Sequence, residues 1–276
     1  MVRYQEKRIF ICGKTAPELS RSYYETVCSG GVTEDGAPIR LYPVPYRYLE
    51  DDGQFRKYQW ITARVTRDTR DPRPESHRID PDTIQAGEFV PSDEYEWGCR
   101  RDILSRDTSW HFDRLEGPGG LFEAQKRRGT SIALVTPKEI RDVDLYLRPD
   151  GDRVSFEQKR AELLAKNAHD REQRRFFEEF LPPEMKGLEF VRNRVRVNWV
   201  CHAPECAGHA MQIMDWEVLE MQRRLGDAAA LQAARDHLDL SEYAVRFFLG
   251  NLLLHPTRFS IMGVWYPKRA KNLLFV

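Results

Sequence analysis

The chain has 276 residues, of which 41% are hydrophobic and 31% charged, so it is long enough for one large domain or two small ones. Its 43 basic and 43 acidic residues cancel to a formal net charge of +0, which excludes a protein whose overall charge alone would attract nucleic acid. No apolar run is long enough to span a bilayer, so we expect no membrane association.

The start of the chain and its cysteines predict a cytoplasmic protein. Residues 1–8 are rich in charge, and the apolar run that follows them is too short for a secretory signal. The cysteines are odd in number and scattered, which argues against a disulfide framework. We therefore expect free thiols in a reducing compartment at Cys12, Cys28, Cys99, Cys201 and Cys206.

The first half of the chain predicts β structure. Short runs that are apolar, or that alternate apolar with polar residues, are typical of strands. Such runs occur at residues 8–12, 24–28, 38–43 and 58–66. Glycine predicts a turn at Gly30 and Gly31 and a hairpin at Gly36. Strands this short, at this spacing, predict a small barrel or a curled sheet.

Beyond these strands the local patterns become mixed. Residues 67–82 contain prolines and charges of both signs, which is typical of a loop. A clear strand is expected at residues 131–135, before Pro137. A charged stretch follows, and it contains a predicted helix near residues 156–180 that the next two prolines terminate.

The last third of the chain combines strands and helices. Residues 190–200 predict a strand in which Arg192, Arg194 and Arg196 alternate with mainly apolar residues. Period-two spacing places these guanidinium groups on one face of the strand. Helices are expected at residues 215–225 and 227–249, and a final strand at 259–266.

Together these elements predict an α+β protein. The N-terminal half is expected to be β-barrel-like, and the C-terminal half to mix strands and helices and to carry a zinc-knuckle-like loop. We expect a β-rich domain at residues 1–137, a charged helical connector at 138–187 and an α+β domain at 188–276. One continuous fold is the alternative.

The segment CHAPECAGH, residues 201–209, points most directly to chemistry. Zinc takes thiolate and imidazole ligands, which Cys201, Cys206 and His209 supply on a loop after a strand. His202 adjoins Cys201, and neighbouring strand residues point opposite ways, so we expect a distant fourth ligand, His255. The alternative is that these side chains only pack, since a buried cysteine behaves as a small hydrophobe.

A zinc ion at this loop would be either structural or catalytic. A closed set of protein ligands, which we favour, indicates a structural site, whereas a water ligand would indicate a catalytic one. Asp215 and Glu217 are the candidates for a general base on such a water. The simpler interpretation is that Asp215 caps a helix and that Glu217 lies in its first turn.

Two groups of arginines predict contact with phosphate. Arg40 and Arg47 flank two tyrosines and two prolines, so they combine cations with aromatic rings that can stack on bases. The arginine-faced strand adds Arg192, Arg194 and Arg196. The alternative is that nearby acidic residues pair with these side chains and leave no surface for a polyanion.

Three stretches of the chain form an ordered set. They are ETVCSGG at residues 25–31 with RLYP at 40–43, the C-x4-C-x2-H and Asp-Trp-Glu segment at 201–217, and FLGN at 248–251 with the following His-Pro pair. This set resembles uncharacterised bacterial and archaeal proteins over most of the chain, and no known activity comes with the resemblance. It implies that Cys201, Cys206, His209 and His255 belong to one site.

These features predict a protein that binds or processes nucleic acid and carries a structural zinc site, such as a component of a prokaryotic defence or mobile-element system. A metal-dependent hydrolase with an open zinc site is one alternative. A subunit of a protein assembly is another, in which the arginines contact an acidic protein partner.

Overall fold

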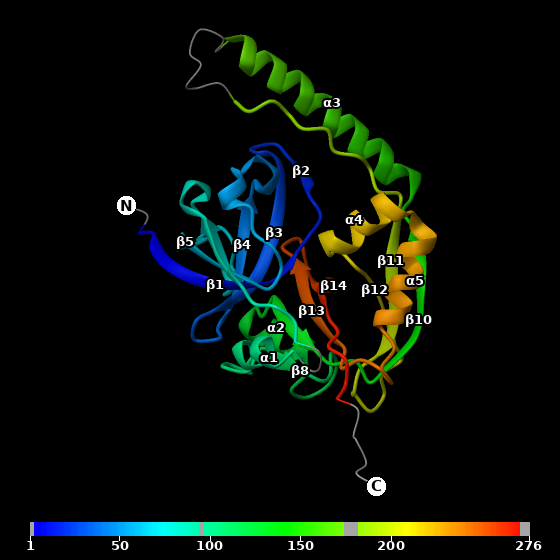
Figure 1. Ribbon diagram of the computed structural model, residues 1–276. Helices are drawn as coiled ribbons and strands as arrows, with labels where there is room; N and C mark the ends of the chain where they lie inside the picture. Colours follow the sequence, from blue (N-terminus) through cyan, green and yellow to red (C-terminus); the bar gives the residue numbers. More distant parts are fainter. Residues whose placement is uncertain (1–2, 94–96, 174–181, 271–276) are drawn as a thin grey trace.

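A closed barrel of five strands forms the N-terminal half of the protein, as the sequence predicted (Figure 1). The structure is a computed structural model that describes residues 3–93, 97–173 and 182–270. Strand Gln5–Lys14 pairs with strand Gln59–Arg67, which closes the barrel, and strands Pro38–Val44 and Ser76–Ile79 form a parallel pair. In order around the barrel, the strands are Gln5–Lys14 (β1), Tyr24–Thr33 (β3), Pro38–Val44 (β4), Ser76–Ile79 (β6) and Gln59–Arg67 (β5).

Alternating apolar residues fill the barrel. Ile9, Ile11, Ile39, Leu41 and Ile61 are at most 1% exposed and belong to one apolar cluster inside it. Burial of each such side chain contributes about 1.5–3 kcal/mol relative to its exposed state. Alternation along the strands therefore both defines the inner face and stabilises the closed form.

The predicted turn at Gly30 and Gly31 is wrong, because β3 runs straight through both glycines to Thr33. A Cβ atom at Gly31 would lie 2.0 Å from the carbonyl oxygen of Phe10, and one at Gly30 would lie 2.7 Å from the ring of Phe248. The glycines thus allow close approach of a neighbouring strand and of the C-terminal half.

Short elements complete the N-terminal half. The predicted hairpin at Gly36 connects β3 to β4, and this glycine has a φ of 87°. The predicted loop at residues 67–82 contains β6, which joins the barrel beside β4. The remaining elements are strands Glu18–Ser20 (β2) and Gln85–Phe89 (β7), helix Gly98–Leu104 (α1), and 3-10 helices Tyr46–Tyr48, Asp51–Gly53 and Pro81–Thr83.

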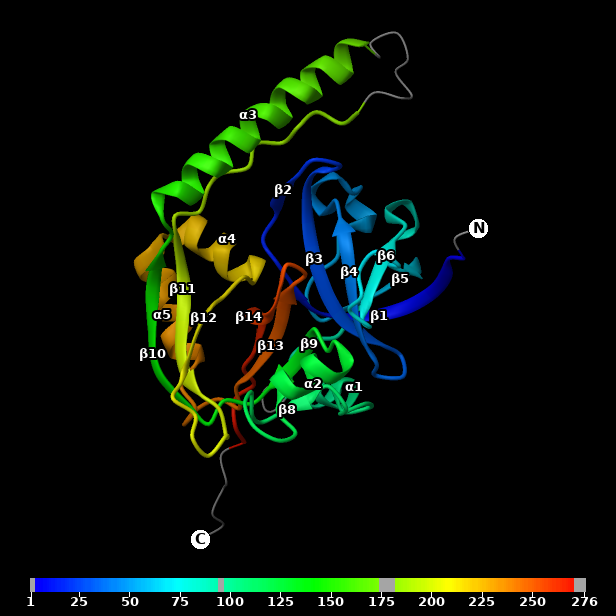
Figure 2. The same ribbon diagram turned by 180° about the vertical axis from the view of Figure 1, so that it is seen from behind.

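Two further sheets form the C-terminal half (Figure 2). The first has the order β14 (His255–Trp265), β13 (Arg246–Leu252), β9 (Ile132–Val135) and β8 (His111–Phe112). The second has the order β10 (Glu139–Leu147), β11 (Asn193–Val200) and β12 (His209–Gln212). The helices of this half are Leu121–Arg128 (α2), Asp150–Gln173 (α3), Trp216–Leu225 (α4) and Asp227–His237 (α5).

Strand β13 joins the two halves of the protein. Phe247 and Leu249 pack with Trp199 in a core between the C-terminal sheets, whereas Phe248 packs with Phe10 in a core against the barrel. In a strand, Phe247 and Leu249 point to one side and Phe248 to the other, as observed, whereas in a helix Phe247 and Leu249 would point in nearly opposite directions. The helix predicted at residues 227–249 is therefore wrong after α5, which ends at His237.

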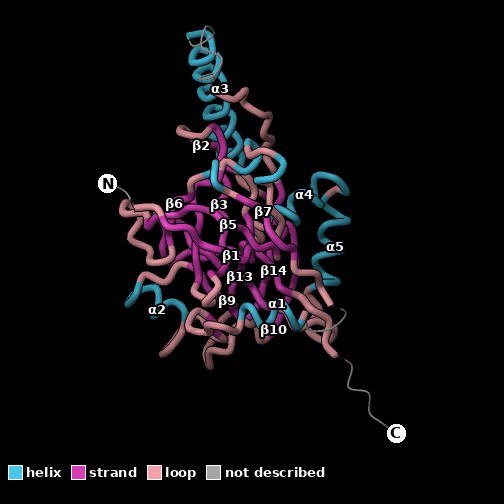
Figure 3. The backbone as a smooth tube through the Cα atoms, turned by 60° about the vertical axis from the view of Figure 1, so that its left-hand side comes forward, coloured by secondary structure: helices cyan, strands magenta, loops and turns pink. Residues whose placement is uncertain are grey.

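Helix α3 extends beyond the rest of the molecule, and the chain returns alongside it (Figures 1 and 3). It confirms the predicted helix up to Gln173, and the predicted continuation to residue 180 lies outside the described residues. Leu163 anchors α3 by packing with Leu19, Tyr24 and Met185.

Two predictions about the chain as a whole can be compared with this fold. No helix among the described residues is long and apolar enough to cross a membrane. The five cysteines are free thiols.

Strand β9, at the end of the first predicted domain, pairs with β13 in the third, so a continuous sheet joins these parts of the chain.

Candidate functional site

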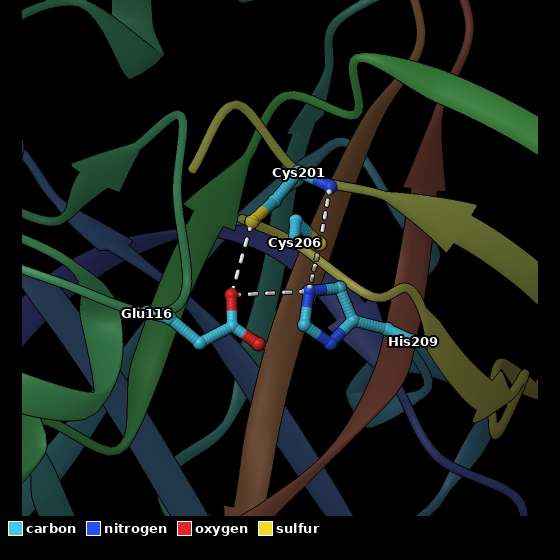
Figure 4. Close-up of side chains that lie close together, drawn as sticks. All are labelled: Glu116, Cys201, Cys206 and His209. Atoms are coloured by element: carbon cyan, nitrogen blue, oxygen red, sulfur yellow. Dashed lines mark hydrogen bonds and ion pairs between the residues drawn. The ribbon is translucent and has the colours of Figure 1, made fainter. Parts of the chain in front are cut away.

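Potential metal ligands meet where the turn between β11 and β12 reaches the segment before α2 (Figure 4). Glu116, Cys201, Cys206 and His209 each offer one ligand atom, and these atoms all lie within 4.8 Å of one another. Glu116 Oε2 lies 3.2 Å from Cys201 Sγ and 3.5 Å from His209 Nε2, which lies 3.3 Å from Cys206 Sγ. Zinc bonds of about 2.0–2.3 Å give a tetrahedron with edges of about 3.3–3.8 Å. The donor types and most of their spacing therefore fit a zinc ion.

Backbone amides point at both sulfur atoms. The N–H of Cys201 donates to Cys206 Sγ, and the N–H of Leu115 donates to Cys201 Sγ, each over 3.4 Å. Such bonds favour the thiolate that zinc binds. Burial raises the pKa of the Cys201 thiol, so a cation would be needed to keep it deprotonated at neutral pH. Burial lowers the pKa of His209, which favours the neutral, ligating form of its imidazole.

The structure does not bring His255 into this group. His255 is exposed at the first residue of β14, where it pairs with Leu252 across the hairpin. Glu116 offers the fourth potential ligand atom in its place. Sequence reasoning missed Glu116 because it lies 85 residues from Cys201, where only the fold can bring a carboxylate to the loop.

Asp215 and Glu217 belong to a different cluster. Asp215 is the N-cap of α4, and its carboxylate accepts the N–H of Glu217 over 2.9 Å, which confirms the helix-cap interpretation. Lys57 Nζ lies 2.8 Å from Asp215 and 2.9 Å from Glu217. Burial opposes the charged form of Lys57, but Asp215, Tyr58 and Glu217 outweigh this effect and raise the pKa of Lys57 well above the usual value. Asp215 and Glu217 thus bind Lys57, which lies in the turn before β5.

Two of the predicted phosphate ligands are occupied within the protein. Arg40 is 3% exposed, and its guanidinium donates to the carbonyl of Ser131 over 2.7 Å and to Cys28 Sγ over 3.2 Å, so it ties β4 to β9. Arg196 forms two hydrogen bonds with Asp144, of 2.8 and 2.6 Å. For these two residues the interpretation that local groups satisfy the arginine is the better one.

A cleft of about 1200 Å³ brings together the other three, Arg47, Arg192 and Arg194. Its walls come from the segment between β1 and β2, the first half of α3, the returning chain, the start of β11, and α4. Aromatic rings of Phe156, Phe190 and Trp216 also line it. The full set of basic side chains in its walls is Arg47, Arg148, Lys159, Arg160, Arg192, Arg194 and Arg223, against five acidic ones.

Most of these cations have a carboxylate partner. Arg47 Nε lies 3.3 Å from buried Glu25, and Arg223 lies 2.7 Å from Glu220. Within the described parts of the chain, Arg194 and Lys159 make no ion pair. Lys159 Nζ donates to the carbonyl of Leu19 over 2.7 Å. The cleft therefore offers a small number of uncompensated positive charges rather than a continuous basic surface.

Comparison with known families divides the chain in two. Residues 5–106 match the model of a domain of unknown function, DUF8758, and residues 119–276 match that of another, DUF8757. The first match covers the barrel and α1, and the second begins just before α2. No curated protein matches the chain. Since the second match covers more than half of its length, the chain belongs to the DUF8757 family, a domain of unknown function that is preceded here by a DUF8758 domain.

Proposed function

We propose that this protein binds single-stranded nucleic acid in the cleft beneath α3. The observation that carries the proposal is the convergence of Arg47, Arg192 and Arg194 with Phe190 and Trp216 on one cavity of about 1200 Å³. Cations that follow the backbone and aromatic rings that stack on bases are what single-strand binding requires. Small-molecule pockets usually occupy about 300–1,000 Å³, so this cleft has room for a segment of polymer.

The barrel supports the same proposal by analogy of fold. Five strands with this order and with β4 parallel to β6 have the topology of an OB-type Greek-key barrel. Such barrels bind oligonucleotides through the face of their second and third strands and through adjoining loops. Here the C-terminal sheet covers part of that face at Gly30 and Arg40, whereas the loop after β1 lines the cleft at residues 16–19. The loop side is therefore where we expect the strand to bind.

Salt dependence tests this proposal. If two to three phosphates are neutralised, the slope of log Kobs against log salt is expected to lie between about −1.4 and −2.1 for a single strand. Fluorescence anisotropy of a labelled oligothymidine, titrated from low to moderate salt, measures this slope. Arg192 lies 3.1 Å from Asp150, but both side chains are exposed, so the pair can open to a phosphate. Arg192→Gln removes this cation of the cleft and is expected to weaken binding and to flatten the slope by at most about 0.7. A flat curve for the unaltered protein would contradict the proposal.

Glu116, Cys201, Cys206 and His209, which we call the Cys201 cluster, are proposed to hold a structural zinc ion. Four protein side chains are enough to complete its coordination, which is typical of structural rather than catalytic zinc. The ion would cross-link the segment at Glu116 to the turn between β11 and β12. A hydrolase has less support, because the predicted bases, Asp215 and Glu217, contact Lys57 instead of this cluster.

A feature of the β13–β14 hairpin favours the assembly hypothesis as a second candidate. Its turn carries Leu252, Leu253 and Leu254, which are 59%, 45% and 85% exposed. Adjacent exposed leucines are typical of a protein contact. Sedimentation that depends on protein concentration, and that becomes independent of it in Leu254→Ser, would support this function.

A further inference from the structure

Arg194 is a buried cation without an acidic partner. Its side chain lines the cleft and the residue is only 7% exposed. In the described part of the chain it makes one hydrogen bond, from Nη1 to Met214 Sδ over 2.9 Å. A guanidinium has five N–H donors, so most of the donors of Arg194 have no acceptor among the described residues. These donors face the cleft, where water or a ligand supplies the acceptors that a largely buried cation requires.

The register of β10 and β11 explains why Arg194 lacks a partner. Arg196 faces Asp144 across the two strands and pairs with it, whereas Arg194 faces Tyr146. The same side of β11 therefore holds one neutralised and one uncompensated guanidinium. Only the second lines the cleft.

Arg148 and Lys159 line the same cleft. Burial and the charge of Arg148 together lower the pKa of Arg194 to about 10, although the carboxylates of Glu18 and Asp152 oppose this shift, so the guanidinium groups of Arg194 and Arg148 repel each other. Asp152, 3.2 Å from Arg148, offsets part of this charge. Lys159 adds an ammonium group whose identified acceptor, the carbonyl of Leu19, is neutral. An anion bound among these groups would relieve the repulsion.

Gln222 provides a complementary acceptor in the wall of the cleft. Its Nε2 donates to the carbonyl of Asn193, the residue before Arg194, and to Asp227. Its Oε1 is buried and has no hydrogen-bond partner in the described structure. A ligand that satisfies this region would offer oxygen acceptors to Arg194 and a nearby hydroxyl or amino donor to Gln222.

We propose that Arg194, with Arg148 and Lys159, binds the terminal phosphate of a nucleic-acid strand. This inference rests on the proposed function and specifies how the strand is placed. A phosphate monoester carries a charge of about −1.5 to −2 at pH 7 and three acceptor oxygens, which suits closely spaced cations. An internal phosphodiester carries a single charge, and both of its ester bonds lead to further nucleotides. Access to a cation that is nine-tenths buried is therefore easier for a chain end.

The test compares oligothymidines of one length that carry a 5′-phosphate, a 3′-phosphate or neither, by fluorescence anisotropy. One terminal phosphate is expected to increase affinity about tenfold or more, as charge-assisted bidentate bonds do. Arg194→Gln is expected to abolish this preference, so that the phosphorylated and unphosphorylated strands bind the variant with equal affinity. Arg196→Gln is the matched control, because it makes the same change on the same strand outside the cleft, and it is expected to keep the preference.

The possible results separate this inference from the proposed function. Equal affinities for all three strands would overturn the terminal-phosphate site and retain single-strand binding. No binding of any strand would overturn both. Circular dichroism checks that Arg194→Gln is folded, and if it is not, Arg148→Gln takes its place, since Arg148 is partly exposed. A folded variant that keeps the full preference would refute the assignment of these residues.

Discussion

Replacement of Lys57 by Met is expected to destabilise the protein by about 3–5 kcal/mol, because it leaves Asp215 as a buried charge without its partner. Lys57 and Asp215 are 6% and 2% exposed, and their charged atoms lie 2.8 Å apart. Asp215 also caps α4 and forms a backbone bridge with Thr15, so the pair joins the barrel to the C-terminal half at one point. Urea denaturation measures the loss as a lower transition midpoint.

A double variant separates the unpaired charge from the lost packing. Asn caps helices nearly as well as Asp, so Asp215→Asn in the Lys57→Met background removes the charge and keeps the cap. We expect it to restore at least half of the lost stability, which is the non-additivity of a coupled pair. Arg56→Met, at the exposed neighbouring residue, is expected to cost less than about 1 kcal/mol. If Lys57→Met were as stable as the parent, the ion pair would not hold the two halves together.

Local periodicity was sufficient to predict the barrel. Residues 58–66 alternate in polarity and residues 38–43 follow a predicted hairpin turn, and these runs form β5 and β4 with a one-residue difference at their ends. The failures came where contacts distant in sequence decide the conformation. Gly30 and Gly31 predict a turn locally, but β1 and β13 approach them so closely that only an extended glycine pair fits. Residues 246–249 continue a helical pattern locally, yet they lie between two apolar cores that require a strand.

The candidate site shows the same division between local and distant information. Spacing within one loop was enough to bring Cys201, Cys206 and His209 together, because all three are held by a single strand-to-strand turn. The fourth potential ligand was not local: the sequence favoured His255, which the fold places outside the group, and Glu116 lies there instead. Fold-level contacts, not local spacing, determine which carboxylate reaches the loop.

The arginine-faced strand gives a second instance. Period-two spacing placed Arg192, Arg194 and Arg196 on one predicted strand, but β11 begins at Asn193, so only Arg194 and Arg196 lie in it, and the spacing could not distinguish between these two. Their surroundings depend on the neighbouring strand β10, which places Asp144 opposite Arg196 and Tyr146 opposite Arg194. The register of two strands more than forty residues apart is thus what separates a neutralised arginine from one available to a ligand.

Removal of zinc from the Cys201 cluster is expected to lower the free energy of unfolding by about 4 kcal/mol, relative to a sample in which the free zinc concentration is a thousand times the Kd. The reason is linkage: the folded protein presents four ligands together, whereas the unfolded chain separates Glu116 from Cys201 by 85 residues. Thermal unfolding with and without a chelator measures the change, and elemental analysis gives the metal content.

Variants then test which side chains hold the ion. Cys206→Ser and Glu116→Gln are expected to lose zinc or to release it at lower chelator concentration, and their stability should respond less to added zinc. His255→Ala and Cys99→Ser are matched controls, since both side chains are exposed outside the cluster, and both variants should keep one equivalent of zinc. Loss of zinc in His255→Ala with retention in Glu116→Gln would reverse the assignment of the fourth ligand. Purified protein that holds no metal and does not respond to a chelator would reduce the cluster to a set of hydrogen bonds.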